Sequence, residues 1–278
     1  MKLRGRDFIL SLDRTAVMGV LNVTPDSFSD GGRWLDPDLA IAHGREMASQ
    51  GAAIVDVGGE STRPGAAPVP EEEELARVVP VIEALADGDA PISIDTRKPS
   101  VARRAIEAGA SIVNDTTGEE FDHEMDAVVA TTGAAMVIMH SRGTPATMRS
   151  LTDYEDVVGD VASFLRWRAE SLVEAGVARE SIALDPGFGF AKTPEQNLVM
   201  LNRIDEILEL GYPVLVGTSR KSFIGAVLDL PEDQRVEGTA ATVAWAVAKG
   251  ARIVRVHDVE QMTRVVRMAE AIRDMRLS

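Results

Sequence analysis

The sequence predicts an α/β protein built as a single-domain (β/α)8 barrel, the TIM-barrel architecture. Eight short apolar segments recur along the 278 residues, and each ends in small or polar residues. Segments with helical periodicity and recognisable start signals separate them. No linker, low-complexity tract or shift in composition divides the chain. This alternation in one uninterrupted unit favours a barrel over a doubly wound parallel sheet, which stays the alternative.

The eight apolar segments are nearly continuous in hydrophobicity, as in the runs Ile-Val-Asp-Val-Gly and Ala-Met-Val-Ile-Met. Strands that are buried on both faces have this pattern, whereas strands with one solvated face alternate. The sequence therefore predicts a parallel sheet that helices cover. The expected strands are Val17–Thr24, Ala52–Gly59, Pro91–Thr96, Ser111–Thr116, Ala134–His140, Ile182–Gly187, Pro213–Ser219 and Arg252–Asp258.

Helix start signals stand between these strands. Asp36 followed by Pro37 predicts an N-cap with proline at the first helical position. Pro70 precedes four glutamates, whose carboxylates suit the positive end of a helix. Thr193, with Gln196 three residues later, predicts a capping box. The expected helices are Leu39–Gln50, Glu72–Ala86, Ser100–Ala108, Asp153–Ala175, Gln196–Leu210, Gly238–Lys249 and Gln261–Met275, with helix-like surface segments around His43 and His123.

The ends of the chain are expected to belong to the same domain, which spans residues 1–278. Residues 1–16 are expected to form a small hairpin or strap across the barrel floor, 17–260 the barrel core and 261–278 a C-terminal helix. The N-terminal residues lack the apolar stretch of a signal peptide, and no apolar run approaches the roughly 18 residues that span a bilayer. We therefore expect a soluble cytoplasmic protein without a membrane partner.

The composition limits the classes of partner. Lys and Arg number 29 against 44 Asp and Glu, which gives a formal net charge of −15, and only five of the basic residues are lysines. Nucleic-acid and membrane-surface proteins need a basic face, so both classes are disfavoured. The absence of cysteine excludes disulfides, thiolate metal sites and cysteine nucleophiles.

Polar residues lie at the carboxyl ends of the predicted strands, where barrel enzymes place their active sites. A buried carboxylate or amide is costly without a partner. The residues form either a satisfied polar layer or a ligand pocket, and the group of Asp95, Asn114 and Asp185 favours a pocket. The strand-end residues are Asn22, Asp56, Asp95, Asn114, Asp115, His140, Asp185, Ser219, Arg255 and His257.

Three strand-end loops are rich in Gly and Pro, and they are either tight turns or a ligand cradle. They cover residues 22–32, 58–65 and 185–192. The seventh strand leads through Arg220 and Lys221 directly into a further predicted helix, a suitable receptor for a carboxylate or phosphate. In the eighth strand, Arg255 and His257 are two residues apart and so share one face.

Five segments together resemble the dihydropteroate synthase family, in order and without a large insertion. The resemblance covers most of the chain and implies a (β/α)8 enzyme of folate synthesis. Such an enzyme condenses 6-hydroxymethyl-7,8-dihydropterin pyrophosphate with p-aminobenzoate, with Mg²⁺, to give 7,8-dihydropteroate and pyrophosphate by an SN1-like path. The segments are MGVLNVTPDSFSDGG (18–32), DVGGESTRPG (56–65), DPGFGF (185–190), GTSRKS (217–222) and RVHDV (255–259).

The resemblance also implies roles for single residues. It implies pterin binding by Asp95, Asn114, Asp185 and Lys221. Asn22 matches the magnesium-associated position, and Asn22, Thr62, Arg63, Arg255 and His257 match the set that handles pyrophosphate. The p-aminobenzoate pocket would comprise Phe28, Thr62, Pro64, Phe190, Lys221 and Ser222, where sulfonamides would compete. The catalytic residues would be Asp95, Lys221, Arg255 and His257.

Members of this family usually dimerise, so a homodimer that binds small molecules is expected. Three other functions remain possible from the residues. A related barrel transfers methyl groups from methyltetrahydrofolate to a corrinoid protein, but it lacks the loops at 18–32 and 56–65 and the 217–222 segment. A Schiff-base aldolase would use Lys221. A silent relative would only bind a pterin or a partner, although the loop residues are intact here.

Overall fold

The computed structural model describes residues 1–24, 36–63 and 65–277, and its central feature is a parallel sheet of eight strands. The strands follow the order β8-β7-β6-β5-β4-β3-β10-β9, and a parallel bridge between Leu184 and Val214 joins the two outer strands. The predicted (β/α)8 barrel is therefore confirmed. The strands are β3 (Ala16–Asn22), β4 (Ile54–Gly58), β5 (Ile92–Asp95), β6 (Ile112–Asp115), β7 (Ala135–Met139), β8 (Ile182–Asp185), β9 (Leu215–Val216) and β10 (Ile253–Val256).

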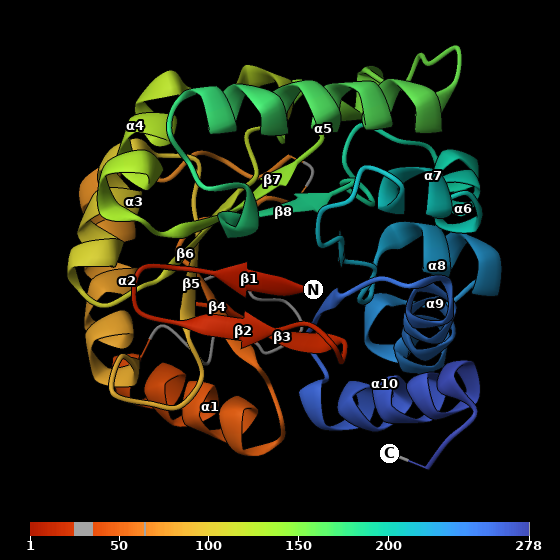
Figure 1. Ribbon diagram of the computed structural model, residues 1–278, viewed down its shortest axis with the longest axis horizontal. Coiled ribbons are helices and arrows are strands. Elements are labelled where there is room, and N and C mark those ends of the chain that lie inside the picture. The colour runs from red at the N-terminus through yellow and green to blue at the C-terminus, as the bar shows by residue number, and fades with distance from the viewer. Residues whose placement is uncertain (25–35, 64, 278) are drawn as a thin grey trace.

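A ring of helices surrounds the strands (Figure 1). The Asp36 side chain accepts a hydrogen bond from the Asp38 N–H, and Thr193 and Gln196 form the predicted capping box. The helices are α1 (Pro37–Ser49), α2 (Glu71–Leu85), α3 (Pro99–Glu107), α4 (His123–Thr132), α5 (Val157–Glu174), α6 (Pro194–Asn202), α7 (Asp205–Leu208), α8 (Ser222–Leu228), α9 (Val236–Lys249) and α10 (Val259–Asp274).

The structure corrects the expected helix Gln196–Leu210, which is in fact two helices, α6 and α7. The chain leaves helical geometry at Arg203, whose φ and ψ are −98° and 24°. This break allows Ile204 and Ile207, both fully buried, to reach the core. The pattern of apolar residues did not reveal the break because both helices present apolar residues to the same core.

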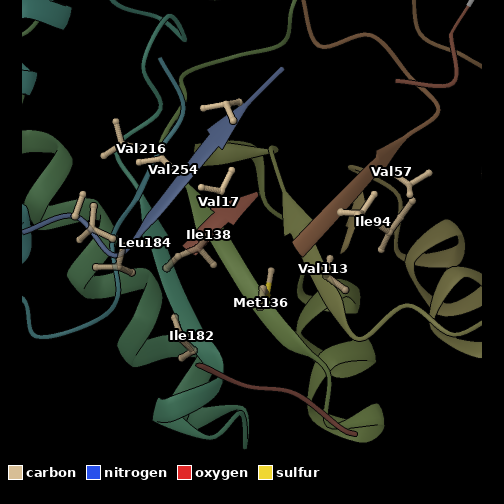
Figure 2. Packing of buried hydrophobic residues seen from close by; sticks show 14 of the residues in the cluster. Val17, Val57, Ile94, Val113, Met136, Ile138, Ile182, Leu184, Val216 and Val254 are labelled. Atoms are coloured by element: carbon tan, nitrogen blue, oxygen red, sulfur yellow. The ribbon is translucent and has the colours of Figure 1, made fainter. Parts of the chain in front are cut away.

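Side chains of each strand alternate between two cores, because successive residues point to opposite faces of a sheet. Val17, Val113 and Met136 point outwards and pack in the cluster beneath the helices (Figure 2). Their neighbours Met18, Ile112, Ala135 and Val137 belong instead to the cluster inside the barrel. Both faces of the sheet therefore bury apolar side chains, as the continuous hydrophobicity predicts.

The floor of the barrel is closed by an antiparallel hairpin of β1 (Lys2–Arg4) and β2 (Ile9–Ser11). Leu3 and Leu12 are fully buried and join the inner cluster with residues at the starts of the strands. Figure 1 shows the hairpin lying across the ring of helices. Within the described part of the chain, no helix has the length and apolar character needed to cross a membrane.

Candidate active site

A cavity of about 670 Å³ lies at the carboxyl ends of the strands. Its lining comes from strand ends and from the loops that follow them. Phe28 and Pro64, which were expected at this site, lie outside the described residues. Most of the other predicted site residues line the cavity: Asn22, Thr62, Arg63, Asp95, Phe190, Lys221, Ser222, Arg255 and His257.

Asn114 and Asp185 are buried and are not among the residues that line the cavity. Their side chains point into the barrel at the ends of β6 and β8, and the two residues are 2% and 7% exposed. A backbone N–H from Gly187 donates to Asp185 Oδ1 at 2.7 Å. Asn114 Oδ1 is buried and has no hydrogen-bond partner among the described residues. These two side chains give the barrel interior the paired acceptor groups that a flat heterocycle with amino and ring N–H groups would require.

Arg255 is held between two carboxylates on neighbouring strands. Its Nε donates to Asp56 Oδ2 at 2.6 Å, and its Nη2 donates to Asp95 Oδ2 at 2.7 Å. Asn114 Nδ2 donates to the same oxygen of Asp56 at 3.1 Å. Asp56 is fully buried. Because its Oδ2 accepts from both residues, it links the guanidinium of Arg255 to the amide of Asn114.

Asp56 is one of the polar residues at the predicted strand ends, but its sequence position alone predicts no role for it at the site. The alternation of residues along the strands could have indicated a role, because Asp56 points into the barrel, as Ser93 and Asp95 do in the neighbouring strand. What the sequence alone lacked was the register of β3, β4 and β10. That register places Val20 opposite Asp56 and Met18 opposite Arg255, which brings the two charges together.

Burial shifts the protonation of the site carboxylates. It raises the pKa of Asp95 to about 7, although Arg255 opposes the shift and Asp56 adds to it. Burial also raises the pKa of Asp185, against the N–H of Gly187 and the charge of Lys221. Groups with such shifted pKa values in a cavity are typical of functional sites.

The basic groups shift in the opposite direction. Burial, reinforced by Arg255, lowers the pKa of Lys221 to about 8. Burial and the cations Arg255 and Arg220 hold the pKa of His257 well below 6.5. His257 is therefore a neutral hydrogen-bonding group near neutral pH, with Nδ1 3.0 Å from the hydroxyl of Ser219.

The loop after β8 brings Phe190 against Lys221. The Lys221 ammonium lies 4.4 Å from the centroid of the Phe190 ring, within the range of a cation–π contact. Gly189 has a φ of +79°, and a Cβ there would lie 3.0 Å from Lys221 Cδ. Glycine at this position therefore lets the lysine side chain pass to the aromatic ring.

On the opposite rim of the cavity, the loop after β4 carries Thr62 and Arg63. Arg63 Nη2 donates to Glu232 Oε1 at 2.7 Å. Both side chains are more than a third exposed, so the ion pair is weak and can exchange with a bound anion. Arg63 thus adds to Arg255 a second guanidinium that lines the cavity of a protein whose net charge is −15.

Residues 18–257 match the family model described as pterin binding enzyme. The chain belongs to this family. Over 261 residues it is 51% identical to a dihydropteroate synthase from Synechocystis, a match that covers 93% of this chain and 90% of the relative. The methyl-transfer and aldolase alternatives find no support in this match, and the expected relation to the dihydropteroate synthases is confirmed.

Solved structures of family members have the same fold. A dihydropteroate synthase from Yersinia pestis, solved with a sulfonamide drug, has a TM-score of 0.94 and 44% sequence identity, and the match covers 99% of this chain and 100% of that one. A dihydropteroate synthase from Burkholderia cenocepacia, solved with 7,8-dihydropteroate, has a TM-score of 0.89 and 41% identity, with 99% and 97% covered.

The cavity at the strand ends offers an oxygen donor that suits a magnesium ion arriving with a phosphate. Among the described residues no group of three His, Asp or Glu side chains could enclose a metal. Mg²⁺ nevertheless needs only one or two protein ligands when phosphate and water oxygens complete its octahedron. The side chain of Asn22, at the end of β3 and lining the cavity, offers one such oxygen.

Proposed function

We propose that this chain is a transferase of folate biosynthesis, a dihydropteroate synthase. It condenses 6-hydroxymethyl-7,8-dihydropterin pyrophosphate with p-aminobenzoate and releases pyrophosphate. The observation that carries the proposal is a single cavity that combines three chemistries. Buried acceptors lie at its base, a clamped arginine stands at its centre, and an aromatic ring beside a lysine forms one wall. The dihydropteroate synthases named above support the same activity.

The pterin ring is recognised at the base of the cavity. Its amino group and adjacent ring N–H can donate to the Asp185 carboxylate, which burial keeps free of water. Asn114 offers both an acceptor and a donor to the mixed edge of the ring. Lys221 donates to the carbonyl and a ring nitrogen. Asp95 completes the set of four pterin-binding residues. These contacts orient the pterin so that its exocyclic carbon faces Arg255.

The pyrophosphate group is held above the pterin by Arg255, His257, Thr62 and Arg63. Arg255 is already fixed by Asp56 and Asp95, so it meets the developing negative charge without first reorganising. His257 is neutral and donates a hydrogen bond. Asn22 would hold Mg²⁺, which when bound supplies further charge neutralisation to the phosphate oxygens.

Departure of pyrophosphate leaves positive charge on the methylene-pterin, by the SN1-like path. The Asp95 carboxylate faces the same cavity and stabilises that charge. Because burial raises the pKa of Asp95 to about 7, the carboxyl can also take a proton as the arylamine attacks. The catalytic residues are thus Asp95, Lys221, Arg255 and His257.

The arylamine occupies the wall formed by Phe190, Lys221, Ser222 and Thr62. The ring stacks near Phe190, and the carboxylate of p-aminobenzoate approaches Ser222 and the first turn of α8. Phe28 and Pro64 complete this pocket in the proposal. Sulfonamides, which share the arylamine shape, compete for the same wall.

The whole chain acts as one pterin-binding domain, and we propose a homodimer in the cytoplasm. Exposed apolar side chains on neighbouring outer helices support the dimer: Val227 on α8, Trp245 on α9, and Met268 and Ile272 on α10. Sedimentation velocity tests this state, and a monomer at micromolar concentration would refute it.

The deciding experiment measures pyrophosphate release by the purified chain. Release should depend on both dihydropterin pyrophosphate and p-aminobenzoate, and the product should be 7,8-dihydropteroate. Chelation of divalent cations with EDTA should stop release, and added Mg²⁺ should restore it. Release without the arylamine would refute the proposed activity, and a rate indifferent to EDTA would remove Mg²⁺ and the metal role of Asn22.

A further inference from the structure

Lys192, the other lysine of the cavity, has no role in the reaction described above. It is 8% exposed and follows the Phe190 loop after β8. Its ammonium donates to the carbonyl oxygens of Gly187 at 3.0 Å and Phe190 at 3.1 Å. A third contact, of 3.1 Å, joins it to His140 Nδ1. Lys192 therefore lines the cavity while its ammonium is bonded to the loop of residues 187–190 and to His140.

The contact with Lys192 bears on the protonation of His140. Burial and the charge of Lys192 lower the pKa of His140 to about 4, so the imidazole is neutral and its Nδ1 accepts from the ammonium. Burial also lowers the pKa of Lys192 to about 7, with Arg142 and Lys221 acting in the same direction and Asp185 and Glu119 opposing. A buried ammonium is costly, and the three acceptors offset that cost.

A second residue holds the same loop from the other side. Asn197, at 2% exposure in α6, accepts from the Gly189 N–H at 2.7 Å and donates to the Thr193 carbonyl at 2.7 Å. Between these anchors, Ala191 has a φ of 46°, a backbone conformation that residues other than glycine rarely adopt. Such strain persists only where surrounding contacts over-determine the backbone.

The held loop shapes only one wall of the cavity. Gly187 and Gly189 form the turn, and Phe190 presents its ring to the Lys221 ammonium at its end. Resting on the function proposed above, we infer that Lys192 and Asn197 are positioning residues for the arylamine: they hold residues 187–192 in the shape that places Phe190 against Lys221. Neither residue touches the reacting atoms.

The test compares Michaelis constants for the two substrates. Lys192→Met should raise KM for p-aminobenzoate by about tenfold, the consequence of leaving buried carbonyls without their donor, while KM for the pterin pyrophosphate stays within about twofold. Asn197→Ala should act in the same direction. Lys249→Met, a lysine on α9 paired with Asp205 at 3.0 Å, is the matched control and should change neither constant. A rise of both constants together would overturn the inference.

Two further measurements separate loop positioning from other roles. In a Phe190→Leu background, Lys192→Met should add less than about twofold, because the two changes act on the same contact. The affinity for neutral 4-aminobenzamide should also fall in Lys192→Met. An unchanged affinity for this neutral ligand would mean that Lys192 acts by its charge on the substrate carboxylate, and the inference would be wrong.

Thermal melting and circular dichroism monitor folding. If Lys192→Met does not fold, Asn197→Ala decides, and unchanged constants in that variant overturn the inference. A wild-type chain that releases no pyrophosphate with both substrates refutes the proposed function. An active wild type with indifferent variants refutes the loop inference alone.

Discussion

The two ends of the barrel are built from the same strands but from opposite chemistry. At the strand starts the inward positions are apolar, as at Ile54 and Ile112, and they pack on the β1–β2 hairpin. Two residues further along the same strands, the inward positions are Asp56 and Asn114. The floor therefore stabilises the fold by apolar burial, whereas the mouth buries polar groups that lower stability and supply chemistry.

The backbone differs in the same way. Ala191 and Arg220 line the mouth with φ values of 46° and 57°, in the left-handed region. The floor hairpin, by contrast, pairs in regular antiparallel register from Lys2 opposite Ser11 to Arg4 opposite Ile9. The mouth thus combines backbone strain with buried charge, a combination that is typical of functional sites. Changes at the two ends should therefore separate activity from stability.

Arg255→Met should have the largest effect, because this residue contributes at the mouth both to the stability of the fold and to the proposed activity. Removing it leaves the buried carboxylates of Asp56 and Asp95 without their cationic partner, and the free energy of unfolding should fall by about 3–5 kcal/mol. Pyrophosphate release should fall below detection. Urea denaturation and the release assay measure the two losses. Adding Asp56→Asn should restore part of the stability and none of the activity, and recovered activity would contradict the role of the guanidinium.

Lys221→Met should separate activity from stability at the mouth. The ammonium lies against the Phe190 ring and, in the proposed function, donates to the pterin, so kcat/KM should fall by about 100-fold to 1000-fold, as when one transition-state donor is lost. Burial lowers the pKa of this lysine to about 8, which means that the folded protein holds its charge at a cost. The free energy of unfolding should therefore stay the same or rise. A destabilised variant would assign Lys221 a structural role.

Leu3→Ala should produce the opposite result at the floor. The fully buried side chain joins the inner cluster, and its truncation should lower the free energy of unfolding by about 2–3 kcal/mol. The kinetic constants of the folded fraction should not change. Ile9→Ala, in the same hairpin but 65% exposed, is the control and should cost under about 0.5 kcal/mol. Altered kinetics in Leu3→Ala would show that floor and mouth are coupled.

Asp95 should give the smallest effect, a dependence of stability on pH. Its pKa is raised in the folded state to about 7, so the folded protein holds a proton that the unfolded chain has already lost. This stability is present below pH 4 and is lost as the pH rises towards 7. Between pH 5 and 7.5, wild-type stability should fall by about 1–2 kcal/mol more than that of Asp95→Asn. Melting of both proteins across this range measures the difference, and parallel profiles would contradict the shift.

Strand and cap positions could be predicted closely because their causes are local. The capping box at Thr193 and the N-cap at Asp36 formed as expected, and the eight apolar segments all became strands. The break at Arg203 was missed, since it depends on the burial of Ile204 against distant elements. The role of Asp56 was missed for the same reason, because its partner Arg255 lies 199 residues away.

The sequence by itself determined the alternation of strands and helices, the end of the barrel that carries polar groups, and the residues that resemble a pterin site. These features depend on periodicity and on neighbours a few residues apart. Only the tertiary structure decided why the pKa of Asp95 is raised, why His257 is neutral, and how Lys192 is bonded to the loop after β8. Each of these depends on burial and on the register between strands, which sets the distances between groups far apart in the chain.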